Sequence, residues 1–257
     1  MFIEPAKNIN LFGITSHKIE IMNDPFGEAI HDYFEQGKAP NLIVNSNYTK
    51  GEKIAASYFF RTEKEMPFIE QSALKKCNGK ILDIGAAGGC HSILLQKKGF
   101  NVTALEKSEK AADVLKKRGI QKVVCTDIYN YSENKFDTIL LLMNGAGIGE
   151  TLAGLEKLMI HLKTLLAEKG QILIDSTDIK YLFEEKDGSV WIDLANDSYY
   201  GEMEYEVKYK KSVTTFKWLF IDFEKLKKVA KKAGLYCILI ENGENHDYLA
   251  QLKPKPE

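Results

Sequence analysis

Apolar and polar residues along the middle of the chain follow two alternating patterns. Short apolar runs, which predict buried strands, are separated by stretches with apolar residues every three or four positions, which predict helices. The clearest helical stretch covers residues 151–166, where leucine recurs at that spacing. The apolar runs that predict strands are residues 81–84, 101–106, 123–125, 136–143 and 170–176.

Two more strands are predicted near the end of the chain, at residues 235–240 and 248–252. They follow a helix that begins at Asp222 and ends at Gly234. Repeated strand–helix units with short links favour parallel pairing and right-handed crossovers. The predicted fold class is therefore α/β: a doubly wound, mostly parallel seven-stranded sheet with helices on both faces.

Residues 1–78 precede the first strand of this sheet and are too few for a separate domain of ordinary size. Asp24 and Pro25 predict the start of one helix, and a second helix is expected at residues 63–77. We expect residues 1–78 to form an N-terminal helical cap and residues 79–257 to form the core.

Residues 177–221 are longer than an ordinary crossover loop and are rich in aromatic side chains, Trp191 and Tyr200 among them. Within them, residues 204–210 and 214–220 alternate in the manner of an antiparallel pair. This insertion predicts a β-hairpin lid over the edge of the sheet.

The first predicted strand leads into a run of small residues, Gly85-Ala86-Ala87-Gly88-Gly89, and then into a helix. Few side chains stand in the way there, so the backbone can come close to a ligand. The free N–H groups of the helix point at the same place. The sequence therefore predicts a ligand-binding turn.

Polar residues end each of the five core strands, and Asp83 is the only charge inside the first apolar run. Glu106 comes about twenty residues after the first glycine, where an acid accepts hydrogen bonds from ribose hydroxyls. The carboxyl ends of parallel strands meet at one edge, so these groups are expected to converge. The five polar residues are Asp83, Glu106, Asp127, Asn144 and Asp175.

The spacing of small residues separates two classes of cofactor. A dinucleotide fingerprint needs Gly-x-Gly-x-x-Gly, but Ala87 holds the middle position and Cys90 the last. An acid two residues before the first glycine, followed by Gly85-x-Ala87-x-Gly89, resembles motif I of class I S-adenosylmethionine (SAM) dependent methyltransferases. Ala87 replaces the usual second glycine.

The resemblance covers about residues 79–176 and implies SAM as cofactor, a small-molecule substrate and a final strand antiparallel to the others. It implies that Asp83 faces the ammonium end of SAM, Glu106 the ribose, and Asp127 with Ile128 the adenine. For the reaction centre the candidates are Asn144, Arg61 and Tyr200, and no general base stands out. The cofactor-binding candidates are Asp83, Gly85, Ala86, Gly89, Glu106, Lys107, Asp127, Ile128, Met143 and Asn144.

We predict that the enzyme moves the methyl group of SAM to a nitrogen or oxygen nucleophile of a small molecule. Two alternatives stay open: an NAD-linked oxidoreductase on a Rossmann-like fold, and a non-catalytic SAM-binding module. Nucleic-acid methylation is less favoured, because Asn144 is followed by Gly145-Ala146-Gly147 in place of two prolines and an aromatic residue.

Composition narrows the class of protein further. An apolar content of 44% supports a full core, and 35 basic against 36 acidic residues leave no basic footprint for nucleic acid. The four scattered cysteines lack metal-ligand or redox spacing, so we expect reduced thiols and no metal. Neither a leader pattern nor a membrane-spanning run is found. We expect a cytoplasmic monomer or homodimer without membrane partners.

Overall fold

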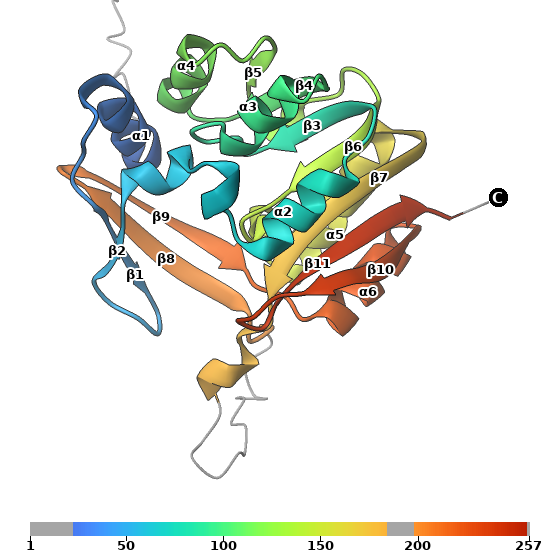
Figure 1. Ribbon diagram of the computed structural model, residues 1–257. Coiled ribbons are helices and arrows are strands. Elements are labelled where there is room, and N and C mark those ends of the chain that lie inside the picture. The colour runs from blue at the N-terminus through green and yellow to red at the C-terminus, as the bar shows by residue number, and fades with distance from the viewer. Residues whose placement is uncertain (1–22, 184–197, 256–257) are drawn as a thin grey trace, which may run out of the picture.

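A seven-stranded sheet forms the centre of the computed structural model, which describes residues 23–183 and 198–255 (Figure 1). Its strand order is β10-β11-β7-β6-β3-β4-β5. The strands from β7 to β5 pair in parallel, whereas β11 pairs antiparallel with both β7 and β10. The predicted sheet and its antiparallel final strand are confirmed. The strands are β3 (Lys80–Ile84), β4 (Asn101–Glu106), β5 (Val123–Cys125), β6 (Phe136–Leu141), β7 (Leu166–Thr177), β10 (Leu235–Asn242) and β11 (Asp247–Pro254).

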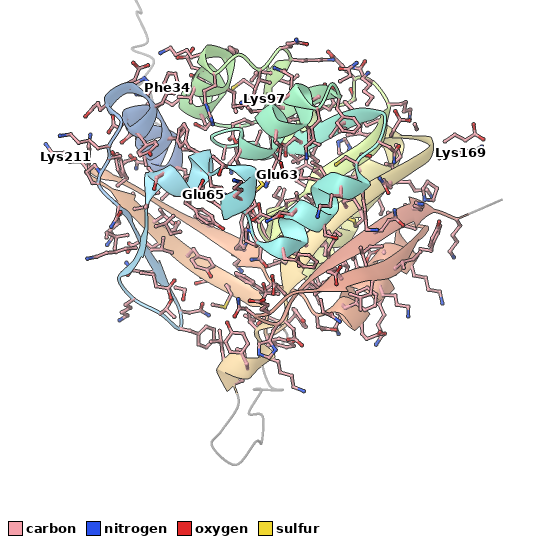
Figure 2. All side chains as sticks on the ribbon, viewed as in Figure 1. Phe34, Glu63, Glu65, Lys97, Lys169 and Lys211 are labelled. Carbon is pink, nitrogen blue, oxygen red and sulfur yellow. The ribbon has the colours of Figure 1, made fainter. Side chains whose placement is uncertain are left out.

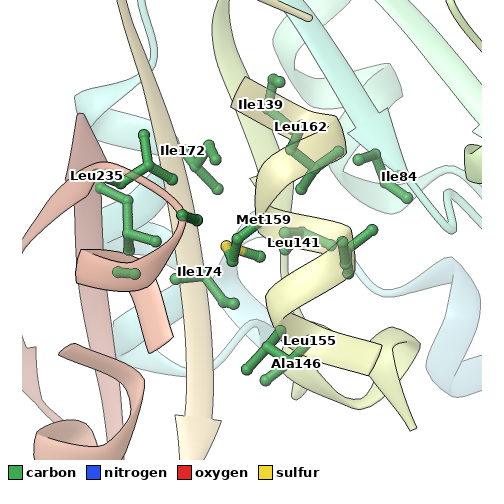
Figure 3. Packing of buried hydrophobic residues seen from close by; sticks show 14 of the residues in the cluster. Ile84, Ile139, Leu141, Ala146, Leu155, Met159, Leu162, Ile172, Ile174 and Leu235 are labelled. Atoms are coloured by element: carbon green, nitrogen blue, oxygen red, sulfur yellow. The ribbon is translucent and has the colours of Figure 1, made fainter. Parts of the chain in front are cut away.

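Helices cover both faces of this sheet, as the apolar runs of its strands require. On β6, Ile139 and Leu141 belong to the cluster around α5 and α6, and Leu140 belongs to the cluster around α2 and α3. Figure 3 shows Leu155, Met159 and Leu162 of α5 against the first of these faces. The helices are α2 (Phe68–Lys76), α3 (Cys90–Lys97), α4 (Glu109–Lys117), α5 (Leu152–Leu165) and α6 (Phe223–Lys232).

A second, four-stranded antiparallel sheet has the order β2-β1-β8-β9. Strands β8 (Glu202–Tyr209) and β9 (Ser212–Leu219) form the predicted hairpin. Strands β1 (Leu42–Ser46) and β2 (Glu52–Ile54) come from the N-terminal segment, and α1 (Pro25–Gln36) packs against the sheet (Figure 1). The hairpin is thus held on one side by the first part of the chain. Residues 184–197 of the insertion, with Trp191, lie outside the described residues.

The N-terminal segment differs from its prediction in two ways. The expected helix at residues 63–77 is wrong in its first half: a short 3-10 turn, η2 (Glu63–Glu65), precedes Pro67, and α2 begins at Phe68. The ring of a proline excludes the residue before it from helical geometry, so one helix cannot continue through Pro67. Strands β1 and β2 were not predicted. The helices α1 and α2 of the cap are present.

Four further 3-10 turns connect these elements: η1 (Ala56–Phe60), η3 (Ile128–Asn130), η4 (Gly145–Gly149) and η5 (Ile179–Phe183). Charged side chains such as Lys169 and Lys211 extend from the periphery (Figure 2). Among the described helices, none has the length and apolar character needed to span a membrane.

Candidate active site

The small-residue turn between β3 and α3 lies against the end of β4. The N–H of Gly85 donates to the carbonyl of Leu105 at 2.8 Å, and the N–H of Ala86 donates to the same oxygen at 3.2 Å. Gly85, Ala87 and Gly89 all have positive φ, at 71°, 49° and 84°. Such angles suit glycine and cost an alanine conformational energy, so Ala87 is held in place by its surroundings. Gly85 remains exposed, which leaves this part of the turn open to a ligand.

Asp83 and Glu106 are both buried at the ends of neighbouring strands. The hydroxyl of Ser92 donates to Asp83 Oδ2 at 2.6 Å. The two oxygens of Glu106 accept the N–H groups of Ala87 at 2.8 Å and Ser108 at 2.9 Å. Burial raises the pKa of Glu106. A carboxylate offers about four acceptor positions, so each acid keeps capacity for a ligand beside the turn.

The residues expected around the adenine lie at the end of β5, next to β4. Asp127 is exposed, and its Oδ1 accepts the N–H of Tyr129 at 2.9 Å. The side chain of Ile128 is buried in the main core rather than at the open edge. Lys107 is exposed after Glu106. Asp127 is thus free to contact a ligand through its second oxygen.

Strand β6 ends in a strained turn. Met143 and Asn144 both adopt the left-handed region, with φ of 65° and 56°. Asp175, on β7, accepts the N–H groups of Met143 at 3.2 Å and Gly145 at 3.3 Å, while Thr177 donates to Asn144 at 2.9 Å. Burial raises the pKa of Asp175 to about 7. Strain of this kind persists only where neighbouring groups enforce it, and it is concentrated at functional sites.

Arg61 does not extend into solvent but lies buried within a cluster of charges. It donates to the carboxylate of Glu70 and, at 2.8 Å, to the carbonyl of Tyr58. His91 Nε2 lies 2.6 Å from the same Glu70 oxygen. Burial alone would lower the pKa of His91, but contacts with Cys90 and Glu70 raise it well above its usual value. The cluster of Arg61, Glu70 and His91 therefore carries net positive charge beside the turn.

Two members of that cluster, Glu70 and His91, were not predicted as site residues. His91 is the second residue after Gly89, and this position close to the turn was the available signal. Glu70 lies in the first turn of α2, and nothing in its sequence neighbourhood distinguishes it from a solvated helix charge. Arg61 Nε has no partner among the described residues, so one buried donor of the guanidinium remains free.

Tyr200 lies in an aromatic group near the second sheet. Its hydroxyl donates to Asp178 at 2.8 Å, and its ring lies 4.3 Å from that of Tyr199. The described residues that line the neighbouring cavity include neither Tyr200 nor Arg61. The structure therefore does not bring these two candidates together with Asn144 on the cavity wall.

A cavity of about 390 Å³ lies between the second sheet and the edge of the central sheet. Met143 and Asn144 reach it from the core side, so it adjoins the end of β6. Its wall also includes Glu52, Tyr58, Glu70, Asp175 and Tyr205. Within the described ranges, no three His, Cys, Asp or Glu side chains are grouped to hold a metal ion.

The sheet order and the acids along one edge define a nucleoside-binding α/β protein. A family model described as a methyltransferase domain matches residues 59–240. The chain is 38% identical to a SAM-dependent methyltransferase from Bacteroides fragilis, solved with S-adenosyl-L-homocysteine (SAH), over 91% of this chain and 96% of that one, with a TM-score of 0.85. The chain therefore belongs to the class I SAM-dependent methyltransferases.

Two more distant structures show the same fold. CcbJ, a methyltransferase from Streptomyces caelestis, is 13% identical over 91% of this chain and 99% of that one, with a TM-score of 0.60. CalS10, an amino pentose methyltransferase from Micromonospora echinaspora, was solved with SAM bound; it is 15% identical over 75% and 94% of the two chains, with a TM-score of 0.54. A search of curated proteins found no match.

Proposed function

We propose that this SAM-dependent methyltransferase binds its cofactor along the ends of β3, β4 and β5 and methylates a small molecule in the adjoining cavity. Glu106 holds the ribose, Asp83 faces the ammonium group, and Asp127 contacts the adenine. The backbone from Gly85 to Gly89 passes the methionine part. The acceptor offers nitrogen or oxygen as its nucleophile.

One observation carries this proposal: the cavity adjoins the end of β6, and β6 is the strand beside the glycine-rich turn of β3. A ligand on the turn and a second ligand in the cavity therefore meet near Met143 and Asn144. A volume of about 390 Å³ is near the lower end of the usual range for small-molecule sites. That size favours a small acceptor over a macromolecule.

The chemistry needs little from the protein beyond position. A lone pair on the acceptor forms a bond to the methyl carbon, and the sulfur–carbon bond breaks with its electrons going to sulfur. The sulfonium is already activated, so holding the two reactants in line supplies much of the rate. Asn144 is fixed by Thr177, which makes it suited to orient the acceptor.

Arg61 has a different role in this proposal from the catalytic one expected of it. Glu70 and the Tyr58 carbonyl fix its guanidinium, and Nε keeps a free donor. A buried arginine with an unused donor is suited to bind a carboxylate, and SAM carries one on its methionine part. We therefore assign Arg61 to the cofactor. Tyr200 keeps no role in the reaction.

The partners proposed for the chain follow from its charge and the size of its cavity. A net charge of −1 gives no general attraction to nucleic acid, which supports a small-molecule acceptor. The chain is proposed to act as a monomer or a homodimer, and chromatography with light scattering would distinguish the two.

Calorimetric titration with SAH tests the cofactor site. Glu106→Gln keeps the size of the side chain but removes charge-assisted hydrogen bonds to ribose, worth about 1.5–3 kcal/mol each, so SAH affinity should fall at least about tenfold. Asp137→Asn is the control: Asp137 also accepts a backbone N–H, that of Lys80, but at the opposite end of the strands. Equal SAH affinity in wild type and Glu106→Gln would contradict the assignment.

Two measurements test the alternative functions, an oxidoreductase and a non-catalytic binding module. Binding of NADH without binding of SAH would favour an oxidoreductase. Tight binding of SAH without methylation of any member of a broad metabolite panel would favour a binding module.

A further inference from the structure

The charged side chains described on the wall of the acceptor cavity are all acids, and the cations Arg61 and His91 lie behind one of them, Glu70. Among its described lining residues, four are acids and none is lysine, arginine or histidine. This inference rests on the proposed function, because it concerns the acceptor in that cavity. The four acids are Glu52, Glu70, Asp175 and Asp247.

The four carboxylates are not equally available to a ligand. Glu70 is engaged by Arg61 and His91, and Asp247 accepts the N–H of Asn245 at 3.0 Å. Asp175 accepts two backbone N–H groups through long hydrogen bonds of 3.2 and 3.3 Å, which leaves acceptor positions on both oxygens.

Asp175 is also the carboxylate nearest the reaction centre. It is 4% exposed and bonds directly to the backbone on either side of Asn144. Glu52, on β2 across the cavity, is exposed, and its side chain forms no hydrogen bond among the described residues. The cavity thus has one buried carboxylate at its inner end and one solvated carboxylate on the second sheet.

This arrangement discriminates between acceptor classes. A carboxylate or phosphate acceptor would meet the carboxylates of Asp175 and Glu52, whereas the nearby cations Arg61 and His91 lie behind Glu70 and are not on the described wall. A cationic acceptor would find Asp175 in a setting of reduced dielectric, where a charge-assisted hydrogen bond is stronger. The aromatic ring of Tyr205 on the same wall adds attraction for a cation, whereas the ring of Tyr58 already has the Arg61 guanidinium over it, 4.2 Å from the ring centroid.

We propose that the acceptor is a small primary or secondary amine, that Asp175 holds its nitrogen, and that Asp175 takes up its proton before methyl transfer. An ammonium group has no lone pair, so one proton must first move from nitrogen to the Asp175 carboxylate. The freed lone pair then forms the bond to the methyl carbon, and the electrons of the sulfur–carbon bond go to sulfur. The sulfonium becomes a neutral thioether, and the nitrogen regains a positive charge.

The surroundings of Asp175 give this step a pH dependence. Burial raises the pKa of Asp175 to about 7. The titratable groups that face it are Tyr58 of η1, Glu70 of α2, His91 of α3 and Tyr248 of β11. The pKa of Glu70 is lowered from its ordinary value, and those of His91 and the two tyrosines are raised. Asp175, with a pKa of about 7, changes charge between pH 6 and 8.

Three probes of one shape and different charge test the proposal: benzylamine, benzyl alcohol and benzoate, titrated into SAH-saturated enzyme at pH 8. Benzylamine should bind at least about tenfold more tightly than either of the others, as one charge-assisted hydrogen bond predicts. Its affinity should fall about tenfold between pH 8 and pH 6, as the ionised fraction of Asp175 falls. Asp175→Asn should remove most of the preference and the pH dependence, and the control Asp137→Asn should keep both.

Several results would overturn this inference without touching the cofactor assignment. They are equal or tighter binding of benzyl alcohol or benzoate, no binding of benzylamine at millimolar concentration, or an unchanged preference in Asp175→Asn. Loss of SAH binding in the wild type would instead contradict the proposed function. If Asp175→Asn does not fold, the probe comparison and the pH series on the wild type still decide.

Discussion

At the scale of single residues, Asp175 connects the strained turn to the cavity. Its two oxygens accept the N–H groups on either side of Asn144, so the carboxylate stabilises a backbone with two consecutive left-handed residues. That conformation costs of the order of 1–3 kcal/mol for each residue outside glycine. Burying a carboxylate is also unfavourable, and the raised pKa of Asp175 records that cost. The turn therefore keeps a costly group where an acceptor would meet it.

The cost of burying the Asp175 carboxylate should be visible in how the free energy of unfolding changes with pH. The folded-state pKa of Asp175 is about 7 against an ordinary value of 3.8, so the folded protein binds more protons between those values. Its contribution to stability is complete below pH 3.8 and is lost as the pH rises through 7. Asp175→Asn does not titrate there. From pH 5 to pH 8, its free energy of unfolding relative to wild type should rise by about 2–3 kcal/mol. Urea denaturation at both pH values measures this, and parallel pH dependences would contradict it.

Some site residues could be predicted from the sequence because their position depends on one strand alone. Asp83 lies near the end of an apolar run, Glu106 and Asn144 each follow one, and parallel strands bring such ends to one edge. Arg61 and Glu70 depend on how two N-terminal elements pack together. No local pattern specifies that contact, so Arg61 was predicted as a candidate for the reaction centre, and Glu70 was not predicted at all.

At the scale of elements, the second sheet shows why strands can be missed. Strand β2 has three residues, and β1 ends in the polar pair Asn45-Ser46. The conformation of β1 is fixed by pairing with β8, which lies more than 150 residues further along the chain, and β2 pairs with β1 in turn. The hairpin of β8 and β9 was predictable because its own alternation and turn define it. The partner of the hairpin was not.

The hairpin is also expected to support the reaction centre. Trp218 of β9 packs on Gly147 of η4, where an added methyl carbon would lie 2.0 Å from the indole. Gly147→Ala should therefore push β9 away from the turn after β6. We expect a loss of about 1–3 kcal/mol in stability, as overpacking usually causes, and a larger loss in methyl transfer than in SAH affinity.

Thermal unfolding of Gly147→Ala measures the change in stability, and the rate of methyl transfer, compared with SAH affinity from titration, measures the second effect. Thr215→Ala, an exposed change in the same strand, is the control and should alter stability by less than about 0.5 kcal/mol. Unchanged turnover in Gly147→Ala would show that the hairpin does not hold the turn.

At the scale of the whole molecule, the second sheet joins strands of the N-terminal segment to the hairpin of the insertion. A shared apolar cluster joins α1, β1 and η1 of the N-terminal segment to α4 of the core and β8 of the insertion. The division into a cap of residues 1–78 and a core of residues 79–257 describes the order of the chain, and it stays a prediction for folding. The cluster favours one cooperative unit, because removing either part would expose the apolar surface of the other.

The substitution Leu42→Ala tests whether the cap and the core unfold as one cooperative unit. Leu42 is fully buried in the shared cluster, so the change should cost about 2–5 kcal/mol through lost burial and an unfilled cavity. In a Trp191→Phe background Trp218 is the remaining tryptophan, and its fluorescence reports on the contact between the two sheets. A single cooperative unit requires that this fluorescence and far-ultraviolet circular dichroism shift together to the same lower denaturant midpoint. An earlier fluorescence transition, with the circular dichroism midpoint unchanged, would mean that the second sheet unfolds by itself and that the acceptor cavity can open without unfolding the cofactor site.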